Sequence, residues 1–345
     1  MIHAFAWLAW LAATVTVASL TRNPLYLLVL LSELALVMEA VYFTSQNELV
    51  VPIAPGRFAL FIIPASALFN GLTSHFGETV LFRLPDIIPL LGGPVTVEAL
   101  VYGALNGLIL ATLFAAFTVL NLAVPMRDLI RVIPRAFYPV ALVISIAVTF
   151  VPTTLRQIQQ IREAQAVRGH RMRGLRDWLP LFMPLLVGGL ERAFQLAEAM
   201  TARGFASETD AVRDPYAQLG SIAALALLLN GGLLHLLWGH PLWGALLMAM
   251  GTGALFWVLR RVGRRVRHTV YRRSPWTRRD WMVVTGAGAA ALPLVILGEK
   301  VRYYTPYPLL TLPRFHPWAG VALLGLIVPA LLILSALRHD RRDPG

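Results

Sequence analysis

The sequence predicts an all-α, polytopic membrane protein with about eight transmembrane helices and long amphipathic helices on the cytoplasmic side. The composition is the first reason: 57% of the 345 residues are hydrophobic and 14% are charged, whereas soluble chains have about 25% charged residues. The second reason is that several apolar stretches approach or exceed the roughly 18–20 residues that a helix needs to cross a bilayer. A transmembrane β-barrel would instead require short segments of alternating hydrophobicity, and the sequence does not show them.

The excess of positive charge and the lack of cysteine limit the function further. The formal net charge is +12, and in a membrane protein such an excess is typical of arginines that gather in cytoplasmic loops. We therefore expect no nucleic-acid partner. The absence of cysteine excludes disulfides, thiolate catalysis and cysteine-based metal sites. Residues 2–20 are apolar and lack a basic region before them, so we expect a retained first helix rather than a cleaved signal peptide.

The first predicted region, residues 1–125, consists of membrane helices. Four apolar stretches are expected to form them: residues 3–20, 24–43, 57–73 and 96–124. Glu33 and Glu39 fall in the second of these helices. Carboxylates at membrane depth are costly and usually face protein or water. Two interpretations stay open for them: contact with a partner subunit or a neighbouring helix, or placement of a tilted helix at the membrane interface.

Residues 74–95 separate the third and fourth helices and are rich in proline and glycine. We expect an irregular or interfacial segment here. Its charged and titratable residues are His75, Glu78, Arg83 and Asp86. Histidine and carboxylates suggest a metal site, but this spacing matches no zinc-ligand pattern. We therefore expect neither a metal nor another cofactor.

The second predicted region, residues 126–215, begins with three arginines spread over 127–135. The apolar run at 137–151 that follows is bracketed by Pro139 and Pro152. About 15 residues rise roughly 22 Å as a helix, which is short of the ~30 Å hydrocarbon core. Both flanks are rich in arginine, and a single crossing would place one of them outside, against the positive-inside rule. We therefore expect this run to be re-entrant or to lie at the cytoplasmic interface.

Two amphipathic helices are expected next, one from residue 153 to near Gly169 and one over residues 179–203. Each ends in the same phrase, Glu-Ala-x-x-x-Arg-Gly, at 163–169 and again at 198–204. An arginine in the last turn is favoured by the helix dipole by roughly 0.3–1 kcal/mol, and the glycine after it lets the chain turn sharply. The guanidinium then projects from the helix tip, where its five donors suit carboxylates and carbonyls of a partner. One such ending is an ordinary helix terminus, but two matching helix endings predict a surface that another protein binds.

Three short runs of the sequence carry a resemblance to a known family: Thr149-Phe150-Val151-Pro152, Ala164-Gln165-Ala166-Val167-Arg168-Gly169 and Ala199-Met200-Thr201-Ala202-Arg203-Gly204-Phe205. They are similar to the transmembrane T component of energy-coupling factor transporters, the EcfT/CbiQ-like family, which belongs to ABC importers of vitamins or transition-metal ions such as cobalt. The resemblance covers roughly residues 1–240 and is most specific over 149–205. It implies that two helix tips dock on a pair of ABC ATPase subunits through six residues: Ala166, Arg168, Gly169, Ala202, Arg203 and Gly204.

The function that the resemblance implies is that of a non-catalytic coupling subunit, which transmits ATP-driven motion of the ATPases to a separate substrate-binding membrane component, the S component. The sequence agrees, because it contains no Gly-x-x-x-x-Gly-Lys-Ser/Thr motif and its only lysine is Lys300. It also lacks His-Glu-x-x-His and Gly-x-Ser-x-Gly, so we expect no enzyme activity. The alternative is a stand-alone secondary transporter, which would need polar groups near the membrane midplane and often shows an inverted repeat.

The third predicted region, residues 216–345, contains four further apolar runs: 216–237, 241–259, 281–298 and 317–337. Nine arginines fall within residues 260–280, and placing them and the basic tail on the cytoplasmic side of the cell membrane gives cytoplasmic N- and C-termini. We interpret the 260–280 segment mainly as a topology signal, with binding of anionic membrane lipids as a second interpretation. Residues from about 241 to 337 extend past the usual end of the family. They either hold the complex together or form a lineage-specific addition.

Overall fold

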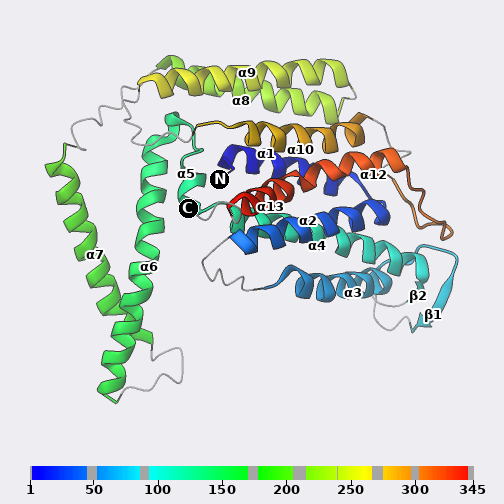
Figure 1. Ribbon diagram of the computed structural model, residues 1–345, viewed down its shortest axis with the longest axis horizontal. Coiled ribbons are helices and arrows are strands. Elements are labelled where there is room, and N and C mark those ends of the chain that lie inside the picture. The colour runs from blue at the N-terminus through cyan, green and yellow to red at the C-terminus, as the bar shows by residue number, and fades with distance from the viewer. Residues whose placement is uncertain are drawn as a thin grey trace. The chain divides into compact units, whose positions relative to one another are not determined.

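The computed structural model describes residues 2–44, 53–85, 93–169, 178–204, 215–238, 240–265, 275–296 and 303–340. Within these ranges the chain is mostly helical, and eight helices are long and apolar enough to cross a membrane (Figure 1). The predicted fold class is therefore confirmed. The helix at the N-terminus, α1 (Ala4–Leu20), is also apolar but has 17 residues, slightly fewer than the other candidate spans.

The chain forms two compact units, residues 1–129 together with 272–345, and residues 130–271. We call them unit 1 and unit 2. Besides α1, unit 1 contains these helices: α2 (Pro24–Thr44), α3 (Pro55–Thr73), α4 (Val97–Ala123), α10 (Arg278–Ile296), α12 (Pro317–Leu323), the 3-10 turn η3 (Leu324–Ile327) and α13 (Val328–Asp340). The short helix α5 (Met126–Ile130) follows α4 at the boundary. The first four helices begin and end within about two residues of the predicted positions.

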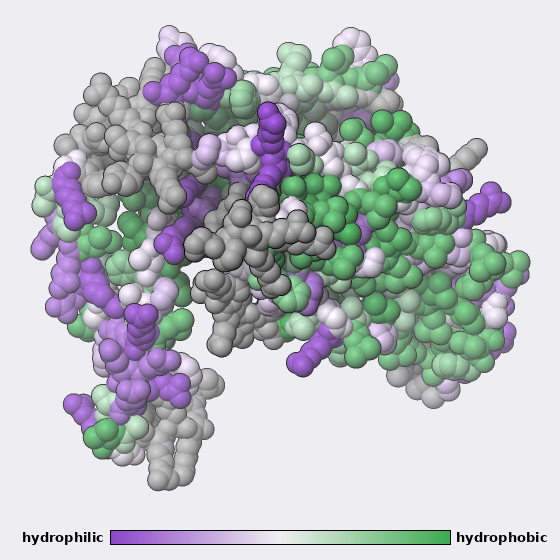
Figure 2. All heavy atoms as spheres, viewed as in Figure 1, coloured by the Kyte–Doolittle hydropathy of each residue, from purple (hydrophilic) through white to green (hydrophobic). Residues whose placement is uncertain are grey.

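Small residues bring the helices of unit 1 close together. Gly103 and Gly107 of α4 face the backbone of α3, and a Cβ added at Gly107 would lie 2.8 Å from the Cα of Ile63. Such approach of backbones is typical of helix packing in membranes, where the hydrophobic effect does not drive association and van der Waals contact must do so. In Figure 2 much of the visible surface of unit 1 is hydrophobic, as a surface in lipid requires.

The C-terminal helices belong to the same compact unit as the N-terminal helices. The indole Nε1 of Trp10 donates to the carbonyl of Leu326 at 2.9 Å, and the amide Nδ2 of Asn23 donates to the carbonyl of Arg314 at 2.8 Å. The backbone N–H of His3 donates to the Asp280 carboxylate at 2.6 Å. Trp10 is fully buried and Asn23 nearly so. Of the helices beyond the expected family core, α10, α12 and α13 therefore pack with α1 and α2 in unit 1, whereas α9 belongs to unit 2.

Residues 74–95 fold differently from the prediction. The chain forms a small antiparallel sheet of β1 (Val80–Leu84) and β2 (Gly93–Thr96), with an irregularity between Val80 and Phe82. The expectation of an irregular segment was wrong for these strands, because the run Val-Leu-Phe favours extended backbone more than the neighbouring prolines and glycines oppose it. Asp86 lies outside the described residues, and within the described ranges no group of three His, Asp or Glu side chains is placed to hold a metal ion.

The described residues of unit 2 form four long helices and one short 3-10 turn. They are η1 (Arg135–Phe137), α6 (Tyr138–Val167), α7 (Leu179–Ala202), α8 (Pro215–Leu236) and α9 (Pro241–Arg265). The apolar run at 137–151 is not separate: α6 continues through Pro152 for 30 residues. A proline removes one backbone hydrogen bond, and a long helix tolerates that loss. The re-entrant interpretation was therefore wrong, since a re-entrant segment must turn back. The placement at the cytoplasmic interface stays a prediction.

Candidate functional site

Two long helices of unit 2 cross each other and hold the residues that the sequence points to. The side chain of Arg192 on α7 donates from Nη2 to the Oε1 of Gln157 on α6, and from Nε to the carbonyl of Gly188 at 3.0 Å. Gly188 lies directly against the Gln157 side chain, which leaves no room for a Cβ. The helices thus meet at a crossing formed by Gln157, Gly188 and Arg192, and Figure 1 shows them crossing. Sequence reasoning missed this crossing, although Gly188-Gly189 within an amphipathic helix was a signal of close approach.

The two helices end with nearly the same backbone geometry. Arg168 follows α6 with φ −78° and ψ 6°, and Arg203 follows α7 with φ −89° and ψ 4°. The next residues, Gly169 and Gly204, have φ of +79° and +80°. Only glycine adopts this left-handed conformation without strain. The N–H of Gly169 donates to the carbonyl of Ala166, and that of Gly204 to Thr201, both at 2.9 Å. Both predicted helix ends are confirmed.

All the predicted docking residues are exposed within the chain. Ala166, Arg168 and Gly169 are exposed at the first tip, and their counterparts Ala202, Arg203 and Gly204 at the second. Val167 beside the first arginine is 89% exposed. An added Cβ at Gly169 would meet no described residue within 4 Å. Each tip therefore presents one guanidinium next to small side chains, a shape that admits a partner close to the backbone.

The tips do not meet but lie at opposite ends of the crossed pair. In Figure 1, α6 descends to its end at the bottom, and α7 then rises to its end at the upper left. The structure therefore does not gather the six predicted residues into one site. It forms two separate sites with the same local geometry, joined through the helix crossing.

Helix α7 carries an apolar stripe that the described part of the chain does not cover. One stripe of α7 contains Leu181, which is 4% exposed, and Arg192, which bonds to Gln157 on α6. Another stripe consists of Leu186, Leu190 and Phe194, which are between 55% and 62% exposed. These residues form an apolar face, as expected for the amphipathic helix that the sequence predicts over 179–203. The structure shows that the face lies open within the described chain, where bilayer or another protein must cover it.

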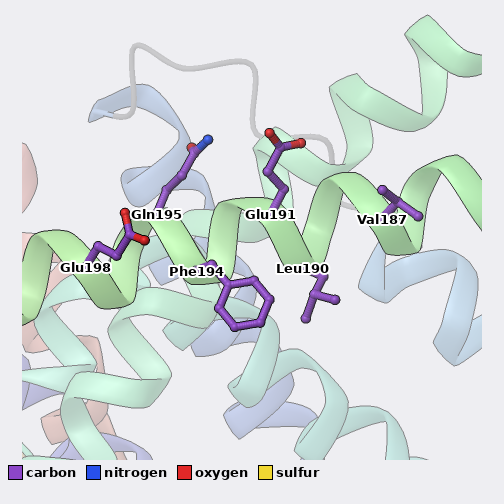
Figure 3. Close-up of a pocket in the computed structure, with 6 residues that line it drawn as sticks. All are labelled: Val187, Leu190, Glu191, Phe194, Gln195 and Glu198. Atoms are coloured by element: carbon purple, nitrogen blue, oxygen red, sulfur yellow. The ribbon is translucent and has the colours of Figure 1, made fainter.

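A shallow hollow along α7 combines this apolar stripe with acidic and amide groups. Its lining residues are Val187, Leu190, Glu191, Phe194, Gln195 and Glu198. In Figure 3, Leu190 and Phe194 point to one side of the helix, and Glu191 and Gln195 point to the other. The hollow is thus amphipathic, which suits a helix that runs along a membrane boundary or a mixed protein surface.

The carboxylates of the second membrane helix differ in their surroundings. Glu33 is only 3% exposed within unit 1, and neither of its oxygens has a hydrogen-bond partner among the described residues. Glu39, by contrast, is exposed. For Glu33 the structure supports contact with neighbouring helices, one of the two open interpretations. An unpaired carboxyl in a buried position is unusual and marks a group with a task or a destabilising cost.

The sequence of this chain is similar to those of known proteins. The model of the family described as CbiQ, cobalt transport protein, matches residues 3–212. The chain is 31% identical over 146 residues to the energy-coupling factor transporter transmembrane protein EcfT 1 of Listeria monocytogenes, covering 36% of this chain and 54% of the relative. It is 28% identical over 200 residues to the EcfT protein of Macrococcus caseolyticus, covering 48% and 74%. For the EcfT protein of Staphylococcus aureus, the identity is 27% over 177 residues, covering 44% and 65%. The match thus spans about half the length of the first of these relatives.

Proposed function

Because a family model matches more than half of its residues, this chain belongs to the CbiQ family of cobalt transport proteins, and we propose that it is the transmembrane coupling component of an energy-coupling factor transporter. In this role the chain performs no catalysis itself. A pair of ABC ATPase subunits supplies the energy, and a separate membrane S component binds the substrate. The observation that carries the proposal is the pair of exposed Arg-Gly tips with matching backbone geometry on two crossing helices.

Docking follows from the chemistry of the tips. The carbonyls at each helix C-terminus carry partial negative charge, which stabilises Arg168 and Arg203 where they project. Each guanidinium offers five donors in a planar fork, so it binds carboxylates or carbonyl groups in a groove of the ATPase. Ala166 and Ala202 keep the approach open, since they add little bulk beside the arginine. The two tips, being separate, engage one ATPase subunit each.

Transmission of motion depends on the crossing. When the ATPases change their separation, the tips are displaced relative to each other. The bond between Arg192 and Gln157, together with the tight packing at Gly188, keeps the helices in contact during this displacement. The motion is therefore passed along the apolar first half of α6 and along α7 rather than lost in separate bending of the helices.

The substrate-binding partner contacts the open side of α7 in this proposal. Leu186, Leu190 and Phe194 form an exposed apolar stripe that suits a partner within or at the surface of the cell membrane. The S component decides the substrate, which we propose to be a transition-metal ion such as cobalt, as in the description of the family, or a vitamin. Cytoplasmic N- and C-termini remain part of this proposal.

A charge reversal at both tips tests the docking. We expect Arg168→Glu/Arg203→Glu to abolish co-purification of the ATPase pair when all subunits are produced together, because two attractive contacts become repulsive. The matched control is Arg156→Glu/Arg162→Glu, which makes the same change at exposed positions of α6 away from the tip and is expected to keep the ATPases bound. Retention of the full complex by the double tip variant would refute the proposal.

One observation favours the alternative of a stand-alone secondary transporter. The buried, unpartnered carboxyl of Glu33 is the kind of intramembrane group that carries protons in such transporters. That function predicts uptake of radioactive cobalt ion by proteoliposomes that contain only this chain and a proton gradient, with loss of uptake in Glu33→Gln. The coupling function predicts no uptake until the ATPases, ATP and the S component are added.

A further inference from the structure

The helices α8 and α9 form a tight hairpin that brings aromatic and basic side chains together at one end. The backbones touch along its length: an added Cβ at Gly231 would lie 2.9 Å from the carbonyl oxygen of Gly244. Near the open end, a Cβ at Gly220 would lie 2.8 Å from the Cγ2 of Val258. Tyr216 precedes Gly220 by one turn, so it lies beside the last turns of α9.

The last turns of α9 carry a basic face. Trp257, Arg260, Arg261 and Arg264 recur at helical spacing and line one hollow on the surface of the protein. The guanidinium carbon of Arg261 lies 5.3 Å from the ring centroid of Trp257 and 5.7 Å from that of Tyr216. These two cation–π contacts hold Arg261 in place. We call these five residues the α9 basic site.

The two helices that form the site contribute basic side chains to it and no acidic ones. Neither α8 nor α9 contains an aspartate or a glutamate. Arg260 and Arg264 are exposed to the surroundings. The nearest acidic residues in the sequence, at positions 208, 210 and 214, lie outside the described residues. The hollow therefore presents the two exposed guanidinium groups of Arg260 and Arg264 to an anion that reaches it.

The surroundings of the site select a lipid as that anion. Trp257 and Tyr216 are 54% and 69% exposed, and tryptophan and tyrosine beside arginine are typical of the level of lipid headgroups. The rest of α9 towards the hairpin turn is apolar and suits acyl chains. We propose that the α9 basic site binds the phosphate of an anionic phospholipid headgroup, with arginines as donors in the bidentate geometry that phosphate favours.

The proposed lipid site lies next to the start of α6. Gly263 faces η1, and an added Cβ there would lie 3.3 Å from the Cβ of Arg135 and 3.4 Å from the N of Ala136. Since η1 leads directly into α6, a bound headgroup stabilises the base from which α6 extends. The binding itself depends on unit 2 alone and needs no ATPase, so its test is independent of the proposed coupling function.

Native mass spectrometry of the purified full chain tests this inference. The protein is reconstituted with equal parts of phosphatidylglycerol and phosphatidylcholine and then released in mild detergent. We expect retained phosphatidylglycerol on the wild type. Each basic residue near an anionic surface contributes about fivefold to affinity. Retention should therefore fall on the order of 100-fold in Arg260→Gln/Arg261→Gln/Arg264→Gln. In each of the single variants Arg260→Gln and Arg264→Gln, we expect retention of phosphatidylglycerol to fall about fivefold. These two variants test the proposal if the triple variant does not fold.

The matched control removes the same charge elsewhere. Arg57→Gln/Arg83→Gln/Arg314→Gln neutralises three exposed arginines outside unit 2 and should retain phosphatidylglycerol as the wild type does. The proposal would be overturned if this control lost as much phosphatidylglycerol as the triple variant, or if the wild type retained both lipids equally. The arginines would then act only as a topology signal. Displacement of the lipid by millimolar inorganic phosphate would also overturn it, since it would assign the site to a soluble anion.

Discussion

At the scale of single residues, the backbone conformation of each tip depends on its glycine. Gly169 and Gly204 hold a φ near +80°, which costs other residues roughly 1–2 kcal/mol. An added Cβ at Gly169 would meet no described residue within 4 Å, so we attribute the effect of a substitution there to this strain. In the proposed docking, the arginine reaches the ATPase only if the chain turns at this glycine.

We therefore expect Gly169→Ala to weaken binding of the ATPase pair by about tenfold, the equivalent of roughly 1.4 kcal/mol, as measured by titration of labelled ATPase against the reconstituted chain. The control is Gly189→Ala, which lies inside α7 with open space around it. Alanine is favoured over glycine there by roughly 0.5–1 kcal/mol, so this variant should bind normally and melt at a slightly higher temperature. Unchanged binding in Gly169→Ala would mean that the tip does not dock in this conformation.

At the scale of elements, a change at the crossing of α6 and α7 can test the proposed transmission separately from the proposed docking. Gly188→Leu displaces the Gln157 side chain and breaks its bond to Arg192, while both tips keep their geometry. We expect this variant to retain the ATPases in co-purification but to lose ATP-driven uptake by the assembled transporter. Gly189→Ala, on the neighbouring position, should keep both. Full uptake with Gly188→Leu would show that the crossing does not transmit the motion.

The elements also show what the sequence could and could not predict. Helix ends at Gly169 and Gly204 were predictable because capping is local and depends on a few neighbouring residues. The break at Pro152 was predicted wrongly, since the local cost of a proline is outweighed by the many remaining hydrogen bonds of a 30-residue helix. The contact between Gln157 and Arg192 was not predictable, because it joins two helices and depends on their packing.

At the scale of the whole molecule, the C-terminal helices were recognised as membrane segments, but their place in the structure was not predictable from the sequence. Apolar composition gives the length of a helix and says nothing of its neighbours. The hydrogen bonds of His3, Trp10 and Asn23 with Asp280, Leu326 and Arg314 show that the C-terminal segment completes unit 1. The sequence boundary of the family match, at residue 212, is thus not a boundary of packing.

Removal of residues 272–345 is therefore expected to destabilise the chain as a whole. The deletion exposes the indole N–H of Trp10 and uncovers α1 and α2, and each buried polar group left without a partner costs about 1–3 kcal/mol. We expect the shortened chain to aggregate in detergent on size-exclusion chromatography. A chain lacking only residues 341–345 should elute and melt as the intact protein does. A monodisperse, stable deletion variant would show instead that the last helices are dispensable for unit 1.

The position of the crossing has a mechanical consequence. Arg168 comes eleven residues after Gln157, and Arg203 comes eleven residues after Arg192. At 1.5 Å per residue, each tip lies about 16 Å from the contact between the helices. The contact is thus a pivot from which the two helices extend over equal lengths to their tips. In the proposed complex, a rotation about this pivot moves both tips by the same distance. Two ATPase subunits that close symmetrically therefore exert equal forces on the two tips.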